Sequence, residues 1–240
     1  MFSRDGRRTE WDVTMRGKAR HIRPVLGSPG FSLIEMMIVL AIVGIVAALA
    51  VPTLIGRTDG ERLKSTVRDL AGAFSFARSE AIRTGEIHIV FVGTDALGNA
   101  LPAINGQPAL ALILNDGTPG STDQNCRIDI GEDSWPIEVA RGVSGGVVTG
   151  ATQMPEDFGT GVLSTGSTFT EPDGDAASWV LFRPEGTAHA FDSACLIGDL
   201  GTGAGGIYLN NGERQFGIAL RPLGNARVRV WDEGNTRWGS

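Results

Sequence analysis

An apolar run near the start of the chain constrains its folding more than any other feature. From Met36 to Ile55, twenty consecutive residues carry no charge, which corresponds to about 30 Å of helix, the thickness of the hydrocarbon core of a bilayer. A helix of this length is predicted to span a membrane. The basic residues before it predict a cytoplasmic N-terminus and an extracytoplasmic body: Arg16, Lys18, Arg20 and Arg23.

Glu35 is a carboxylate at the edge of this run, and an ionised carboxylate among apolar residues is normally neutralised by a partner. If the chain were cut between Gly30 and Phe31, the new α-amino group would lie one helical turn from Glu35, in the same chain or in a neighbour of an assembly. The alternative is a secretory signal that is removed after Ala50. Glu35 argues against that alternative.

The stretch Gly30-Phe31-Ser32-Leu33-Ile34-Glu35 resembles the prepilin peptidase site of type IV pilins and type II secretion pseudopilins. The resemblance implies that residues 1–30 are a leader peptide, that prepilin peptidase cuts after Gly30, and that Phe31 is then N-methylated. It also implies that Glu35 pairs with the N-terminal amine of an adjacent subunit during assembly. The leader is long for this class, and a start at Met15 would leave sixteen residues.

One long helix is expected from residue 31 to residue 84, with its membrane and assembly part at 31–55 and an amphipathic part at 56–84. Pro52 is expected to kink or locally melt it. In the second part, apolar residues recur at three- and four-residue spacing: Leu63, Val67, Leu70, Phe74, Ala77 and Ala81. We expect this stripe to pack on the globular domain and to carry no chemistry.

Beyond Gly85 the apolar pattern changes to the period of two that is typical of β-strands. Strands are predicted at 86–92, 109–115, 178–186 and within 206–231, with loops at 93–107, 116–124 and 150–177. Turn residues at Asn211-Gly212 and Leu223-Gly224-Asn225 predict an antiparallel meander at the C-terminus. The chain is therefore predicted to be α+β, with one antiparallel β domain at 85–240.

Two strings in this domain, Phe-Arg-Pro-Glu-Gly-Thr-Ala at 182–188 and Arg-Val-Arg-Val-Trp at 227–231, resemble the GspH/FimT family of minor pilins and pseudopilins. The resemblance covers the long helix, the first strand and the C-terminal meander. It implies a fold in which two antiparallel sheets pack against the C-terminal half of the long helix.

The two cysteines, Cys126 and Cys195, both follow the apolar run, so the predicted topology places them in an oxidising compartment. A disulfide between them is favoured over two free thiols and would contribute about 4 kcal/mol on the chain-entropy estimate. Two cysteines and three scattered histidines do not suffice for a metal site. No metal and no cofactor is expected.

Several strings that suggest catalysis or ligand binding lack the context that such chemistry requires. Residues 142–146 match G-x-S-x-G without a following helix, and residues 201–206 match G-x-G-x-x-G in front of a strand. The acidic string at 171–177 lacks the further oxygens of a calcium loop. His88 and His189 are interpreted as strand residues with satisfied ring nitrogens, so an enzyme is not expected.

A cluster of arginines near the C-terminus suggests a second kind of function: Arg214, Arg221, Arg227, Arg229 and Arg237. Strand alternation places Arg227, Arg229 and Trp231 on one face, where they could contact phosphates and stack on a base. FimT-like relatives bind DNA through a Gly-Arg-x-Arg segment, of which Gly224 and Arg227 match. Against this, residues 31–240 carry fourteen basic and twenty-four acidic residues, so the body has no general electrostatic attraction for nucleic acid and any such binding needs a local basic patch. Arginines paired with nearby acids are the favoured interpretation.

We therefore expect an H-type minor pseudopilin of a type II secretion system, anchored in the inner membrane with a periplasmic domain, which primes a pseudopilus from its tip. Its expected partners are prepilin peptidase and other minor and major pseudopilins or pilins. The first alternative is a FimT-like minor pilin that binds DNA for uptake. The second alternative is a secreted β domain released after Ala50.

Overall fold

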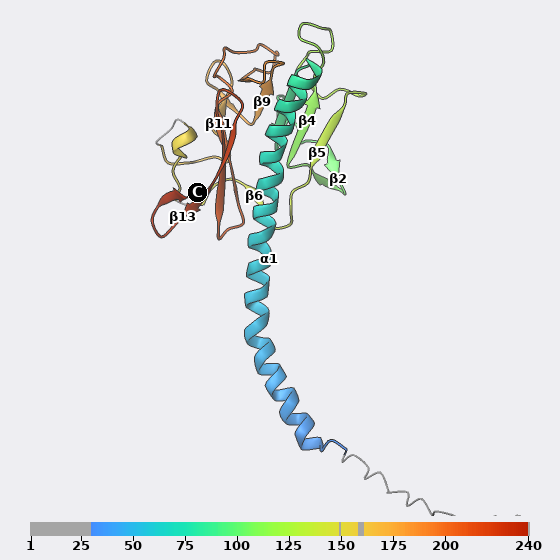
Figure 1. Cartoon of the computed structure of the whole chain (residues 1–240), viewed down its shortest axis with the longest axis vertical. Coiled ribbons are helices and arrows are strands. Elements are labelled where there is room, and N and C mark those ends of the chain that lie inside the picture. Colours follow the sequence, from blue (N-terminus) through green and yellow to red (C-terminus); the bar gives the residue numbers. More distant parts are fainter. Residues whose placement is uncertain (1–29, 149, 158–160, 240) are drawn as a thin grey trace, which may run out of the picture. The chain divides into compact units, whose positions relative to one another are not determined.

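The computed structural model describes residues 30–148, 150–157 and 161–239, and it describes no side chains for 49–58 and 157. Residues 1–29 of the leader predicted at 1–30, with its basic residues and the alternative start at Met15, lie outside the described residues. The chain divides into two compact units, Met1–Ala48 and Leu49–Ser240, which are described separately below. Figure 1 shows the arrangement of elements within the second unit.

The helix α1 extends from Leu33 to Thr84. At its start the carbonyl of Ser32 accepts a hydrogen bond from the Met36 amide at 3.1 Å. At its end Gly85 adopts a left-handed φ of 74°, and its amide donates to the Ala81 carbonyl at 3.0 Å. A glycine in this conformation ends a helix at no steric cost, so the end predicted near Gly85 is confirmed.

Two five-stranded antiparallel sheets form the body of the second unit, with strand orders β10-β9-β1-β4-β5 and β14-β13-β12-β11-β6. The strands of the first sheet are β1 His88–Val92, β4 Ala111–Asn115, β5 Ser134–Ile137, β9 Trp179–Phe182 and β10 Ala188–His189. The second sheet contains β6 Ser144–Gly145, β11 Gly205–Asn210, β12 Gln215–Leu220, β13 Ala226–Asp232 and β14 Arg237–Gly239. The remaining elements are two small ribbons, β2 Ala103–Ile104 with β3 Gln107–Pro108 and β7 Phe169–Thr170 with β8 Ala176–Ala177, and a 3-10 turn η1 at Pro155–Asp157.

The main core joins the amphipathic part of α1 to both sheets. All six residues of the predicted stripe are buried and belong to this cluster. Phe74, which is fully buried, packs on Phe169 with ring centroids 6.2 Å apart. Burial of such a side chain stabilises the fold by about 2 kcal/mol or more. The prediction that the stripe packs on the domain is confirmed.

A second, smaller core lies on the opposite face of the second sheet. Tyr208, Ala219 and Trp231 project from its strands and pack with Met154 and Leu163 of the segment that precedes β7. The Tyr208 hydroxyl accepts a hydrogen bond from the Met154 amide at 3.2 Å. Residues on successive positions of a strand face opposite sides, so both faces of this sheet are covered, one by each core.

The α+β class and the antiparallel sheets agree with the sequence prediction, while several short strands depart from it. The run predicted at 178–186 contains only β9, because a turn closed by the Gly186 amide on the Arg183 carbonyl at 2.8 Å ends the strand, and β10 begins after this turn, outside the predicted run. The ribbons lie in segments predicted as loops. The edge strand β5 was missed, since Pro136 within it weakens any strand signal.

Candidate functional site

The described part of the N-terminal unit exposes apolar side chains on every face of its helix. All residues from 31 to 48 are exposed, with Phe31 and Leu33 at 76 % and 78 %. Glu35, in the first helical turn, is the single charged residue of this stretch. A helix that is apolar all round is stable only in an apolar environment supplied from outside.

Within the described residues, the structure contains no helix that is both long enough and apolar enough to cross a bilayer. The membrane span predicted at 31–55 is thus not confirmed. The helix α1 includes Pro52, whose side chain is not described, and the bend expected there stays a prediction.

Gly30 has open space around it. No heavy atom lies within 4 Å of the position that a Cβ would take, and its φ is not left-handed. The described structure therefore gives no packing reason for a glycine at this position. This open environment is consistent with a glycine that is needed for recognition of the segment by another protein.

On the face of β13 that was predicted to contact DNA, Arg229 and Trp231 make contacts within the chain. The Nε atom of Arg229 donates to a Glu156 carboxylate oxygen at 3.0 Å, and its Nη2 atom contacts the same oxygen. This guanidinium lowers the pKa of Glu156. Because the Glu156 side chain is only 9 % exposed, the pair acts as a structural link between η1 and β13.

Trp231 belongs to the second core and is 8 % exposed. Its ring packs on that of Trp238 with centroids 5.2 Å apart, and the Trp238 Nε1 atom donates to the Thr152 carbonyl at 2.7 Å. The prediction that Trp231 is free to stack on a base is wrong, because the segment that contains Met154 covers this face of the sheet. The alternation of residues along β13 correctly predicted the face on which Trp231 lies, but it could not show that another segment of the chain covers this face.

Four arginines of the cluster remain exposed: Arg214, Arg221, Arg227 and Arg237. In the part of the chain that the structure describes, none of them has a carboxylate within 4.0 Å. Of the three predicted DNA contacts, Arg227 alone stays available, and its role stays a prediction.

Arg78, which nothing in the sequence marked, contacts Gly186 in the string at 182–188 and lies close to Gly224, which precedes the string at 227–231. Its Nε atom donates to the Gly186 carbonyl at 2.9 Å. Gly224 has a left-handed φ of 78°, and a Cβ there would lie 2.6 Å from the Gly186 oxygen and 2.9 Å from Arg78 Cδ. Gly224 is thus required where two turns close on the helix, and Gly186 also adopts a left-handed φ, of 76°. Gly186 belongs to the resembling string at 182–188, and Gly224 belongs to the Gly-Arg-x-Arg comparison, so both positions carried a signal in the sequence.

The two histidines differ in how well their ring nitrogens are satisfied. His189 has both nitrogens in hydrogen bonds, to Thr187 Oγ1 at 2.9 Å and to the Gly198 carbonyl at 3.0 Å. His88 is fully buried, and its Nε2 atom has no partner among the described residues. Burial lowers the pKa of His88. The expectation of satisfied nitrogens is therefore correct for His189 and wrong for His88.

The dismissed motif strings are turns and strands in the structure. Residues 142–146 contain β6, and residues 201–206 lead directly into β11, so neither opens a helix. Within 171–177 the Glu171 amide donates to the Asp175 carbonyl at 2.7 Å, which closes the β7–β8 hairpin. These arrangements agree with the loop interpretation.

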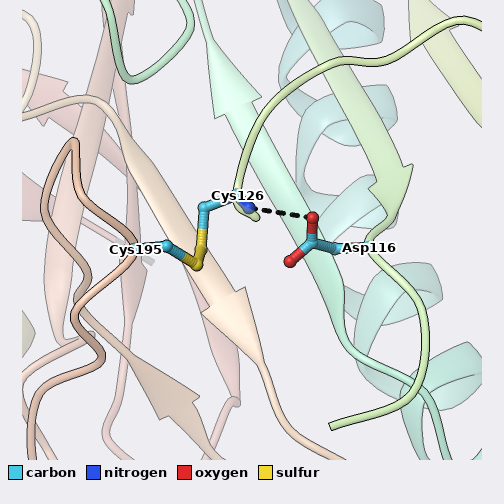
Figure 2. A group of neighbouring side chains, drawn as sticks. All are labelled: Asp116, Cys126 and Cys195. Atoms are coloured by element: carbon cyan, nitrogen blue, oxygen red, sulfur yellow. Dashed lines mark hydrogen bonds between the residues drawn. A yellow bond between two sulfur atoms is a disulfide. The ribbon is translucent and has the colours of Figure 1, made fainter. Parts of the chain in front are cut away.

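Cys126 and Cys195 form a disulfide across a sequence separation of 69 residues, with their Cα atoms 5.3 Å apart. Figure 2 shows the Asp116 carboxylate beside them. These three are the only cluster of three potential ligand side chains found among the described residues, and both sulfurs are bonded to each other. Asp116 was not predicted as a site residue, since no motif near it in the chain marks it.

Comparison with known proteins finds a similarity in the N-terminal segment of the chain. Residues 28–51 match the prokaryotic N-terminal methylation motif, the same stretch that carries Gly30, Phe31, Glu35 and the exposed apolar helix. The chain thus has the N-terminal motif of type IV pilin-like proteins.

A more specific similarity is to a type II secretion system protein H of Xanthomonas campestris pv. campestris. The two are 39 % identical over 56 residues, which cover 23 % of this chain and 33 % of that protein. The match therefore spans about a third of the length of the relative. No solved structure matches the chain. The two findings confirm the resemblance to pilin-like minor pseudopilins of the H type and point to a structural kind of protein.

Proposed function

We propose that the chain is a minor pseudopilin of a type II protein secretion system that joins the tip of a periplasmic pseudopilus and primes its assembly. One observation carries this proposal: the methylation motif at 28–51 coincides with an exposed apolar helix whose single charge is Glu35. The similarity to a secretion protein H favours secretion over other machines that use the same motif.

In this proposal prepilin peptidase cuts after Gly30 on the cytoplasmic side and methylates Phe31. The apolar helix then anchors the protein in the inner membrane in a single pass, with the globular domain in the periplasm. The exposed apolar side chains of residues 31–48 support such an anchor. A disulfide in the globular domain is consistent with an oxidising compartment.

Glu35 would neutralise the N-terminal amine of a neighbouring subunit as the helix passes from lipid into the filament. A charge buried among apolar side chains is tolerated when an opposite charge pairs with it. The position of Glu35 in the first turn, one turn from Phe31, supports this role. The partners would be other minor and major pseudopilins.

Mass spectrometry of the membrane-extracted protein tests the processing step. Wild-type protein co-expressed with prepilin peptidase should begin at a methylated Phe31, and Gly30→Ala should retain its leader. Because a Cβ at Gly30 meets no atom within 4 Å, the substitution leaves packing unchanged. Gly44→Ala is the matched control, since its environment is equally open, and it should be cleaved normally. An N-terminus at Val51, or an intact leader in every variant, would refute the proposal.

The role of Glu35 is tested separately from processing. Glu35→Gln keeps the size of the side chain but removes its charge, so it should be cleaved and methylated normally and yet fail to co-purify with the other pseudopilins. Normal co-purification of the Gln variant would exclude charge neutralisation as the function of Glu35.

A further inference from the structure

Asp116 is a buried carboxylate beside the disulfide. It directly follows β4 and is fully buried. Its Oδ1 atom accepts hydrogen bonds from the amides of Cys126 at 2.9 Å and Asn125 at 3.3 Å. Its Oδ2 atom is buried and has no hydrogen-bond partner among the described residues. A carboxylate oxygen and the two sulfurs lie within 4.8 Å of one another (Figure 2).

The surroundings of Asp116 favour its protonated form. Burial raises its pKa to about 7, opposed by the two amide hydrogen bonds. The charged groups that act on it are the carboxylates of Glu132 and Asp129, which raise the pKa further. A buried carboxyl group that titrates near neutral pH can both give and accept a proton under ordinary conditions.

The two cysteines of the disulfide are not equally exposed. Cys126 is 2 % exposed, whereas Cys195 is partly exposed. Attack by an external thiolate is therefore expected at Cys195, which makes Cys126 the buried leaving group. A buried cysteine leaves more easily as a neutral thiol than as a thiolate, because apolar surroundings disfavour the thiolate charge. A group that donates a proton to the leaving sulfur therefore favours the reaction.

We propose that Asp116, Cys126 and Cys195 form a thiol–disulfide exchange site, in which Asp116 is the catalytic proton-transfer residue and the partner is an external dithiol or its disulfide. This activity is distinct from pseudopilus assembly. It would allow an exchange protein of the oxidising compartment to close or open this bond in the folded domain.

In the reducing direction, a thiolate of the external dithiol attacks Cys195 Sγ, and the bond between the two cysteine sulfurs breaks. Cys126 Sγ leaves with the electron pair and takes the proton of the Asp116 carboxyl group. The second thiol of the partner then loses its proton to solvent and displaces Cys195 from the mixed disulfide as a thiolate, which is protonated from solvent. The protein disulfide gains two electrons, and the external dithiol becomes a disulfide. In the oxidising direction, Asp116 accepts the proton of Cys126 as its sulfur attacks the mixed disulfide at Cys195.

The test is the pH dependence of reduction of the folded, full-length protein in detergent by dithiothreitol. Rate constants are divided by the thiolate concentration at each pH, so that only titration of the protein remains. For wild type we expect this corrected rate constant to fall by about tenfold or more between pH 5 and 9, with a midpoint at about 7, because Asp116 loses its proton. Asp116→Asn should show no such inflection.

The presence of the inflection, and not the absolute rate, decides the outcome. A substitution that loosens the loop around Asp116 can raise the rate constant at every pH, but the pH profile still shows whether Asp116 titrates during the reaction. Asp129→Asn is the matched control, since it removes a nearby charge from an exposed position and should keep the inflection. A flat wild-type profile, an inflection that persists in Asp116→Asn, or one that disappears in Asp129→Asn would each overturn the proposal.

Discussion

Replacing Asp116 by Asn should change how the stability of the protein depends on pH. The pKa of this carboxyl group is raised from 3.8 to about 7 in the folded protein. A pKa that differs by one between the folded and unfolded states corresponds to about 1.4 kcal/mol of difference between the two protonation states. The rise from 3.8 to about 7 therefore amounts to about 4 kcal/mol, which is a large fraction of the roughly 5–15 kcal/mol of total stability that is typical of a domain.

The sign follows from which state holds the proton more tightly. Below pH 3.8 the carboxyl group is protonated in both the folded and the unfolded protein, so it adds no penalty. As the pH rises from there to about 7, the unfolded chain ionises while the folded chain keeps its proton, and the folded state loses about 1.4 kcal/mol per pH unit. Above the folded pKa the penalty stays constant.

Asn removes this titration but keeps an oxygen that can accept the amides of Asn125 and Cys126. Any cost of burying its NH₂ group is independent of pH. Urea unfolding of the disulfide-intact proteins in detergent at a series of pH values measures the difference. We expect the stability of Asp116→Asn relative to wild type to rise by about 4 kcal/mol between pH 4 and pH 8. A difference that does not change with pH would refute this reasoning.

Three further outcomes are expected. Replacing both Cys126 and Cys195 by Ser should lower the unfolding free energy by about 4 kcal/mol, because the bond closes a loop across 69 residues; unchanged stability in urea would contradict this. Gly224→Ala should lower thermal stability by about 2 kcal/mol, because its φ is 78° and its Cβ would lie 2.6 Å from a carbonyl oxygen; an unchanged melting temperature would exclude the clash. In a salt titration with duplex DNA, wild-type protein should show no salt-dependent binding. The DNA-uptake alternative would instead be favoured if the affinity fell with salt, and if Arg227→Gln reduced this salt dependence while Arg229→Gln left it unchanged.

The long helix and the principal strands were predictable because their signals are local. The stripe from Leu63 to Ala81 repeats at the helical period, and all of its members are buried. Gly85 marked the end of the helix, and alternation found β1, β4, β11 and β12 to within a few residues. The strand β5 and the two-residue strands were not predictable, since so few residues carry no periodicity and pairing partners alone define them.

The candidate sites show the same division. The motif from Gly30 to Glu35 is contiguous, so it can be recognised without a structure. The match of residues 28–51 to the N-terminal methylation motif agrees with this recognition. Asp116 lies far from Cys195 in the chain, and the carboxylate and the disulfide are brought together by the sheet and its loops. Conventional spacing rules for ligands or catalytic groups therefore could not identify this cluster.

The sequence alone predicts the N-terminal methylation motif, the helix with its apolar stripe, and the face of β13 on which each arginine lies, because these depend on neighbouring residues and a fixed period. Which of these faces are covered depends on the tertiary fold. Arg229 is neutralised by Glu156, 73 residues away, and Trp231 is buried beneath the segment that carries Met154. Burial and pairing arise from contacts between distant segments, and a strand has the same alternation whether its outer face meets water or a second core.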